Sequence, residues 1–372
     1  MQNTIDHRSG GRRALLLAFM AAVIEGFDLQ AAGVAVPKLA PAFGLTPQQI
    51  GLFFSSATVG LIFGALAGGR VADAWGRRSG LVLSLVTFGI FSAATAYVTS
   101  FEQLVVMRFL TGVGLGGALP NLVNIAAEST DPSRRGRAVS IMYAGVPLGG
   151  AVASGVAILG LHGGDWHSIF LVGGIMPLLV APAIHILLPP LGVVKSEAKS
   201  TSGALSRILA PQTLLTTVAL WVSFFLGLLV VYLLLNWMPQ LLVSRGLARE
   251  EASFVQILFN LGGAAGSLVG GRMLDQRNPV MPVALGFAAA AAALLMLSLL
   301  PAHLGLTLMA GALVGGAILC VQAIFYGVRL NAIPSKSVAP VSAWRWPSAG
   351  SVPSRDHCWR AFSSPAAAAR LT

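Results

Sequence analysis

Ten runs of mainly apolar residues, each long enough to cross a lipid bilayer, restrict the folds that this chain can adopt. A membrane-spanning helix needs about 20 such residues. Charged residues make up only 10% of the chain and hydrophobic residues 55%, whereas a soluble domain carries about 25% charged residues. The sequence therefore predicts an all-α multi-pass membrane protein with spans at 14–37, 50–69, 79–98, 103–127, 138–160, 168–190, 212–237, 252–271, 280–300 and 302–328.

The basic residues gather on one side of these spans. The N-terminus and every second connection carry Arg8, Arg12, Arg13, Arg70, Arg77, Arg78, Arg134, Arg135, Arg137, Lys195, Lys199, Arg207, Arg272 and Arg277. The opposite connections carry only Lys38, Arg245 and Arg249. Because cytoplasmic loops are enriched in Lys and Arg, we expect both termini in the cytoplasm. The net charge of +11 then reports orientation, and we expect no nucleic-acid partner.

The second half of the chain repeats the first half at an offset of 202 residues. Residues 44–73 match residues 246–275 at nine positions, among them a glycine ladder with four-residue spacing and the pattern Gly-Arg-x-x-Asp. Duplicated halves are a common plan among secondary transporters. We therefore expect an N-terminal six-helix bundle at 1–190, a cytoplasmic linker at 191–211 and a C-terminal bundle, with helices 7 to 10, at 212–328.

The tail at 329–372 has a different amino-acid composition. No window in it is apolar enough to span a membrane, yet it holds Trp344, Trp346 and Trp359 among many Ser, Pro and Arg residues. A disordered tail would be polar but is usually poor in tryptophan. We favour a shift of reading frame near residue 329 over a disordered tail, and such a shift would remove the last two helices of a 6+6 protein.

Three charged residues fall well inside the predicted spans: Glu25, Asp28 and Arg108. Charges at such depth are costly and usually functional. Glu25 and Asp28 are three residues apart, so they share one face of a helix. Two close carboxylates in a low dielectric can bind and release a proton near neutral pH. The alternative is a structural pair that neighbouring helices satisfy.

Arg108 allows two interpretations. Its planar guanidinium can pair with Asp28 or hold an anionic substrate. Because Arg108 lies only five residues into its span, its side chain can instead extend to the outer headgroups.

Polar and aromatic side chains also occur near the end of the seventh span. Tyr232 and Asn236 lie one helical turn apart and can hydrogen-bond to and stack on an aromatic ligand. Trp237 fits an interfacial aromatic belt equally well. Gln256 and Gln322 are weaker polar candidates within spans. No nucleophile–base set, Walker loop or HExxH sequence occurs, so we expect no enzyme activity, metal or cofactor.

A basic loop that contains one carboxylate follows the second span. Asp73 can pair with Arg77 or Arg78, and Glu128, at the end of the fourth span, can take an arginine of the same loop. Such pairs would lock the cytoplasmic side shut in one state of a transporter. The alternative is ordinary surface ion pairs, worth under about 1 kcal/mol. The recurrence of the acidic residue as Asp275 favours gating.

These motifs together resemble the major facilitator superfamily. The loop signature Gly-x-x-x-Asp-x-x-Gly-Arg-Arg is matched by Gly69, Asp73, Gly76, Arg77 and Arg78. The fourth-helix arginine with following glycines is matched by Arg108, Gly112, Gly114 and Gly116, and Glu…Pro-x-x-Arg-Gly by Glu128, Pro132, Arg135 and Gly136. Ala74 stands where many members carry a basic residue.

Within that superfamily, Glu25-Gly-Phe-Asp28 is similar to the Asp-Gly-x-Asp signature of the aromatic acid/H⁺ symporters. The resemblance implies proton-coupled import of aromatic carboxylates, such as 3-(3-hydroxyphenyl)propionate or a benzoate-type acid, by alternating access in a bacterial inner membrane. It implies that Glu25 and Asp28 carry the proton and that Arg108 balances them or meets the substrate carboxylate. Tyr232 and Asn236 would contact the ring. We expect a monomer.

Two alternatives remain open. One is a drug/H⁺ antiporter on the same fold, and the other is a non-functional, truncated transporter.

Overall fold

The computed structural model describes residues 2–131, 134–161, 166–188, 211–273, 280–299 and 303–331. Within these residues every regular element is a helix, and ten helical segments are long and apolar enough to cross a membrane. The predicted all-α multi-pass class is therefore confirmed. The predicted linker and tail lie almost entirely, and Asp275 entirely, outside the described residues.

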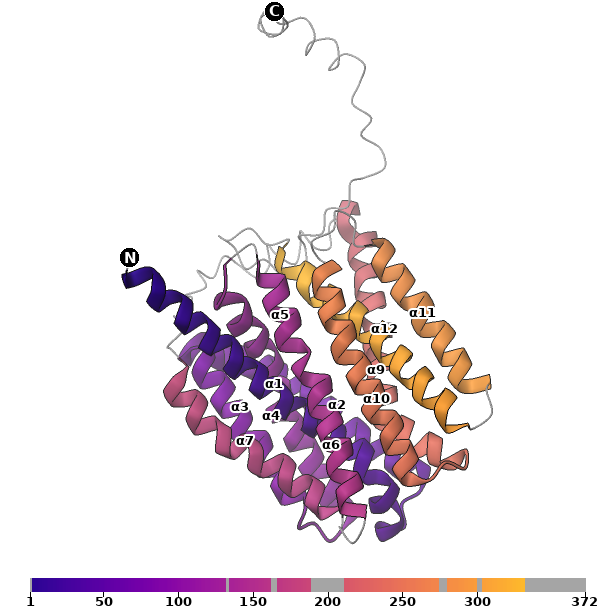
Figure 1. Ribbon diagram of the computed structural model, residues 1–372. Coiled ribbons are helices and arrows are strands. Elements are labelled where there is room, and N and C mark those ends of the chain that lie inside the picture. The colour runs from indigo at the N-terminus through magenta and orange to yellow at the C-terminus, as the bar shows by residue number, and fades with distance from the viewer. Residues whose placement is uncertain are drawn as a thin grey trace, which may run out of the picture.

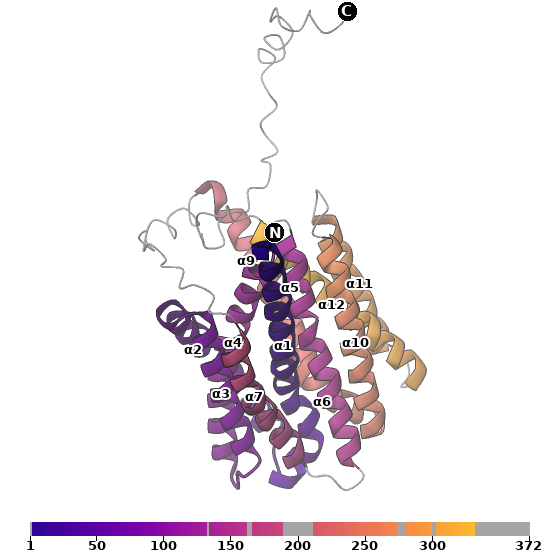
Figure 2. The same ribbon diagram turned by 60° about the vertical axis from the view of Figure 1, so that its left-hand side comes forward.

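The helices form two bundles that lie side by side (Figure 1). The first bundle comprises α1 (Gln2–Phe43), α2 (Pro47–Trp75), α3 (Arg77–Thr95), α4 (Phe101–Glu128), α5 (Arg135–Tyr143), α6 (Gly145–Leu161) and α7 (His167–Leu187). The second comprises α9 (Pro211–Ser244), α10 (Arg249–Met273), α11 (Val280–Leu299) and α12 (Leu304–Asn331). The rotated view shows α6 and α10 next to each other where the bundles meet (Figure 2).

The fifth span consists of two helices, α5 and α6, that meet at Ala144. Pro147 explains the break. Proline has no N–H to give to the carbonyl group four residues earlier, which belongs to Tyr143, and its ring crowds that carbonyl group. The break in the fifth span therefore lies just before Pro147.

The two copies of the glycine ladder make equivalent contacts in the two bundles. In the first bundle, a Cβ atom on Gly64 of α2 would overlap the backbone of Val113 in α4. In the second, a Cβ atom on Gly266 of α10 would overlap the backbone of Gly316 in α12. Small residues let membrane helices approach closely, and van der Waals packing along such seams holds them together. The duplication seen in the sequence is thus a duplication of helix pairs.

The outer surface of the bundles carries large apolar side chains. Leu159, Leu179 and Leu299 are 81%, 71% and 79% exposed, and Phe63 is 56% exposed. A water-soluble protein rarely exposes contiguous apolar patches larger than a few hundred Å². In a bilayer the same surface faces lipid.

Aromatic pairs join the two bundles at two places. Near the start of α2, the ring of Phe54 lies 5.4 Å from that of Trp237 in α9. The ring of Tyr143 in α5 lies 4.9 Å from that of Tyr326 in α12. Ring contacts therefore bridge the interface at two different positions.

The glycine seam between α2 and α4 generates a stability prediction. We expect Gly64→Ala to lose about 1–3 kcal/mol, because the added methyl group must displace the α4 backbone. Thermal unfolding of the purified protein in detergent measures this loss. Gly155→Ala is the matched control, since no packing atom of the described residues lies within 4 Å of its Cβ position. Equal melting temperatures for the two variants would contradict the packing account.

Candidate functional site

A small cavity lies between the two bundles, and the Glu25 side chain lines it. The cavity has a volume of about 40 Å³, and its polar lining residues are Glu25, Gln30, Tyr143, Tyr232, Asn260 and Tyr326. Among the described residues that line it, Glu25 alone is charged. Glu25 is 2% exposed, and its Oε2 atom has no hydrogen-bond partner within the described structure.

Close packing of α1 against α6 fixes the position of Glu25. A Cβ atom on Gly26 would overlap the backbone of Val146, and one on Gly149 would overlap that of Val23. The two helices therefore touch through backbone atoms on either side of Glu25. This contact leaves the carboxylate little room to move away from the cavity.

Asp28 lies inside the first bundle, in contact with α3 and α4. Its Oδ2 atom lies 3.6 Å from Nη1 of Arg108, and its Oδ1 atom accepts a hydrogen bond from the Ser92 hydroxyl group. Asp28 is completely buried and Arg108 is 2% exposed. This is a buried ion pair, in which each partner offsets the charge that the other brings into a low dielectric.

The surroundings of Arg108 decide between its two interpretations. Its guanidinium carbon lies 5.7 Å from the centre of the Phe53 ring and 5.9 Å from that of Phe170. These cation–π contacts and the burial hold the side chain inside the bundle. The alternative in which Arg108 extends to the headgroups is therefore wrong.

Glu25 and Asp28 do not share the same partners, although they share one helix. Glu25 lines the cavity with Tyr143 and Tyr232, whereas Asp28 contacts Arg108 and Ser92. Residues three apart on a helix differ by about 60° around its axis. At the junction of two bundles this angle is enough to direct one carboxylate between the bundles and the other into the first bundle.

The two α9 candidates are placed differently. Tyr232 lines the cavity. Asn236 does not, and its side-chain Nδ2 donates to the backbone oxygen of Tyr232 at 2.8 Å. Trp237 contacts Phe54 of α2.

Three buried amides connect the bundles next to the cavity. Gln30 of α1 bonds to Asn260 and Gln256 of α10, and all three side chains are at most 1% exposed. Gln256 was a candidate from the sequence, whereas Gln30 and Asn260 were not. The available signal was the presence of amide side chains deep within the first and eighth spans.

The basic connection between α2 and α3 forms a network within the first bundle. Arg77 lies 3.8 Å from Asp73 and 3.9 Å from Glu128. Arg78 donates to the backbone oxygen of Leu188, just beyond α7, at 3.4 Å. Gly76 has a φ of 87°, a backbone conformation that glycine adopts without steric cost.

The remaining members of the basic motifs lie nearby. Gly136 is buried in α5, and the Nε atom of Arg135 is buried without a hydrogen-bond partner in the part of the chain that the structure describes. Gly69 lies in α2, and no packing atom of the described residues lies within 4 Å of its Cβ position.

The two ion pairs of Arg77, with Asp73 and Glu128, connect α2, α3 and α4.

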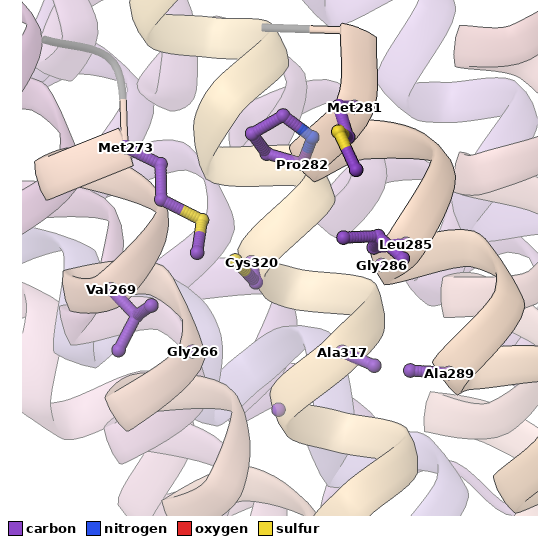
Figure 3. A pocket seen from close by; sticks show the side chains of 11 residues that line it. Gly266, Val269, Met273, Met281, Pro282, Leu285, Gly286, Ala289, Ala317 and Cys320 are labelled. Atoms are coloured by element: carbon purple, nitrogen blue, oxygen red, sulfur yellow. The ribbon is translucent and has the colours of Figure 1, made fainter. Parts of the chain in front are cut away.

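A second cavity, of about 710 Å³, lies between α10, α11 and α12. Figure 3 shows Met273 and Val269 on one side, Met281 and Leu285 on the other, and Cys320 between them. Its described lining is apolar apart from this thiol. Although it is the larger cavity, it has no group that can recognise a carboxylate or take up a proton, so we place the candidate site at Glu25.

Comparison with known proteins adds independent evidence. A family model described as Major Facilitator Superfamily matches residues 18–353. The 3-(3-hydroxy-phenyl)propionate transporter of Escherichia coli (strain K12) is 42% identical over 301 residues, which cover 80% of this chain and 73% of that protein. The 4-hydroxybenzoate transporter PcaK of Pseudomonas putida is 33% identical over 299 residues, which cover 72% of this chain and 67% of that protein. The gallate transporter of Pseudomonas putida is 32% identical over 304 residues, which cover 74% of this chain and 68% of that protein.

Among solved structures, a partially occluded inward-open conformation of the xylose transporter XylE from E. coli matches with a TM-score of 0.69. The match covers 87% of this chain and 85% of that chain at 18% identity. At this identity the likeness concerns the fold alone.

The Asp28–Arg108 pair generates a second stability prediction. We expect Asp28→Asn and Arg108→Met each to lose about 3–5 kcal/mol, because each leaves a buried charge without its partner. The double variant should lose much less than the sum of the two. Thermal unfolding of the four proteins measures this coupling, and strictly additive losses would contradict a buried ion pair.

Proposed function

The chain belongs to the major facilitator superfamily, and we propose that it imports aromatic carboxylates together with protons by alternating access. The relatives that it matches are transporters rather than enzymes. Those relatives are named for 3-(3-hydroxy-phenyl)propionate, 4-hydroxybenzoate and gallate. We propose a substrate of the same class, an aromatic ring with a carboxylate, for this chain.

The observation that carries the proposal is the unpartnered Glu25 oxygen beside the cavity between the bundles. Two negative charges a few ångströms apart repel strongly when little water screens them. An ionised Glu25 would therefore oppose the entry of a carboxylate. A protonated Glu25 removes the repulsion and can donate a hydrogen bond to the substrate, so that proton and substrate bind together.

Asp28 and Arg108 take a different part in this proposal. Their contact lies within the first bundle, and Arg108 is not among the residues that line the cavity. We propose that Arg108 balances Asp28 and that the pair ties α1 to α4, so that the first bundle moves as one body. The coupling proton is then assigned to Glu25.

The small size of the cavity supports a proposal of alternating access. Sites for small organic ligands usually measure about 300–1,000 Å³, whereas the present cavity measures about 40 Å³. The two bundles would therefore have to move apart to admit a substrate. We propose that separation of Phe54 from Trp237 opens the outer side and that separation of Tyr143 from Tyr326 opens the inner side.

We propose that the network around Arg77 lies on the cytoplasmic side and that both termini lie there too. Its ion pairs with Asp73 and Glu128 link α2, α3 and α4. We propose that they keep these helix ends together while the interface opens, which is a gating role exerted through the first bundle. The asymmetry of Lys and Arg between the two sides supports this orientation.

The second candidate function is proton-coupled efflux of apolar cations. The same observation favours it, because Glu25 is the one charged residue among the described lining residues, and a carboxylate beside aromatic rings also suits a cationic ligand. Competition distinguishes the two candidates. If the chain is an aromatic-acid importer, unlabelled hydroxybenzoates should inhibit the uptake of labelled 3-(3-hydroxyphenyl)propionate. If the chain is an antiporter, lipophilic cations should compete for the site instead.

Uptake into proteoliposomes tests the importer directly. We expect the full-length chain to accumulate labelled 3-(3-hydroxyphenyl)propionate when the outside is acidic, and to lose accumulation when an ionophore removes the pH gradient. Glu25→Gln should lose gradient-driven accumulation by at least about tenfold. It should keep exchange of labelled for unlabelled substrate, because a neutral Gln mimics the protonated carboxyl group.

Empty vesicles and the Gly155→Ala variant serve as controls for leakage and for insertion. Gradient-driven accumulation by Glu25→Gln at the wild-type level would contradict the assignment of the proton to Glu25. An inserted protein that transports no aromatic carboxylate under any gradient would contradict the importer proposal itself.

A further inference from the structure

The strongest polar contact between the two bundles is the amide cluster formed by Gln30, Gln256 and Asn260. Gln30 Nε2 donates to Asn260 Oδ1 at 2.9 Å, and Asn260 Nδ2 donates to Gln30 Oε1 at 2.8 Å. Gln256 Nε2 also donates to Gln30 Oε1 at 2.9 Å. The bonds join residues that are 230 and 226 positions apart in the sequence.

The position of Gln30 is built into the surrounding helices. Gly150 of α6 lies against its amide group, and a Cβ atom on Gly150 would overlap the Gln30 side chain. Asn260 is held from the other side, because its Nδ2 atom donates to the backbone oxygen of Gln256 at 2.9 Å. Gln30 and Asn260 both line the cavity that contains Glu25.

The cluster is short of one hydrogen-bond donor. Gln256 is 0% exposed, and its Oε1 atom has no hydrogen-bond partner within the described structure. A buried acceptor without a donor is costly, and native structures seldom keep one without a reason. A carboxylate cannot satisfy this atom because it brings no donor, whereas a hydroxyl group brings one donor and can also accept from an amide N–H.

We propose that this amide cluster recognises the ring hydroxyl group of a hydroxylated aromatic acid, with Gln30 and Asn260 in contact with it and Gln256 as the positioning residue behind them. The inference rests on the proposed transport of aromatic carboxylates and adds the selection of hydroxylated ones. The entering hydroxyl group takes the place of Asn260 in one of its hydrogen bonds with Gln30. The Asn260 Nδ2 donor that this exchange frees can then turn to the unpartnered Oε1 atom of Gln256, which does not itself line the cavity.

The geometry of α1 supports a ligand with polar groups at both ends. Glu25 and Gln30 are five residues apart, which is about 7.5 Å along a helix axis. The cavity between them is lined by aromatic and apolar side chains, including Tyr143 and Tyr232. This spacing matches the length of a hydroxyphenyl acid. Its carboxylate would lie near a protonated Glu25, and its ring hydroxyl group near Gln30.

Hydroxyl recognition also has a consequence for closure. Gln30 belongs to the first bundle, and Asn260 and Gln256 to the second. The hydroxyl group is fully hydrogen-bonded only when the two bundles meet around it. A hydroxylated substrate therefore stabilises the occluded state more than the same acid without the hydroxyl group.

Binding of a matched pair of acids tests the proposal. The full-length protein in lipid nanodiscs is titrated calorimetrically with 3-(3-hydroxyphenyl)propionate and with 3-phenylpropionate, which lacks the hydroxyl group. We expect wild-type protein to bind the hydroxylated acid at least about tenfold more tightly, since tenfold corresponds to about one good hydrogen bond. The ratio of the two Kd values should fall to near one in Asn260→Leu.

Two further variants keep the test independent of misfolding. The double variant Gln30→Met, Asn260→Leu removes both partners of the reciprocal bond, so neither of these two amides is left without the other. Gln256 Nε2 loses its acceptor in this variant. The double variant should also show a ratio near one. Gln322→Met replaces another buried amide, which is not among the cavity-lining residues, and should keep the wild-type ratio.

Equal wild-type affinities for the two acids, or no binding of either, would overturn hydroxyl recognition. A wild-type ratio retained in both Asn260→Leu and the double variant would overturn it as well. Tight, selective binding without uptake in proteoliposomes would overturn the transport proposal alone.

Discussion

A carboxylate inside a bilayer must find a partner, a proton or water, and this constraint organises the whole structure around α1. Asp28 has a countercharge in Arg108, 3.6 Å away, and accepts a hydrogen bond from the Ser92 hydroxyl group, both within the first bundle. Glu25 lies beside the cavity between the bundles, and its Oε2 atom has no hydrogen-bond partner among the described residues. Burial disfavours the charged form of any such group. The unsatisfied carboxyl group therefore lies where a substrate and a proton would enter.

The rest of the molecule holds this arrangement in place. Glycine seams bring backbones into contact within each bundle, as between α2 and α4, so each bundle is a closely packed body. Between the bundles, two aromatic pairs and one amide cluster add to close helix packing. At Gly33 of α1, for example, a Cβ atom would overlap the backbone of Leu235 in α9. The polar and aromatic contacts are the ones that we propose a ligand exchanges when the bundles separate.

The sequence predicted the parts of this structure that depend on local chemistry. Apolar runs gave the spans, and the offset of 202 residues gave the equivalent glycine seams. The direction in which Glu25 and Asp28 face could not be predicted, because it depends on where α1 lies between two bundles. The pairing of Gln30 with Asn260 was missed for the same reason: no local pattern links residues 230 positions apart. Burial of Arg108, rather than extension to the headgroups, also depended on Phe53, Phe170 and Asp28.

The central claim is that an aromatic carboxylate binds only with a proton on Glu25. The most direct measurement is the pH change of a weakly buffered solution when 3-(3-hydroxyphenyl)propionate is added to the purified protein, from neutral to alkaline pH. We predict uptake of about one proton per bound acid by wild-type protein at alkaline pH, and none by Glu25→Gln, which still binds the acid. Substrate binding without proton uptake at any pH, or equal uptake by both proteins, would contradict the account.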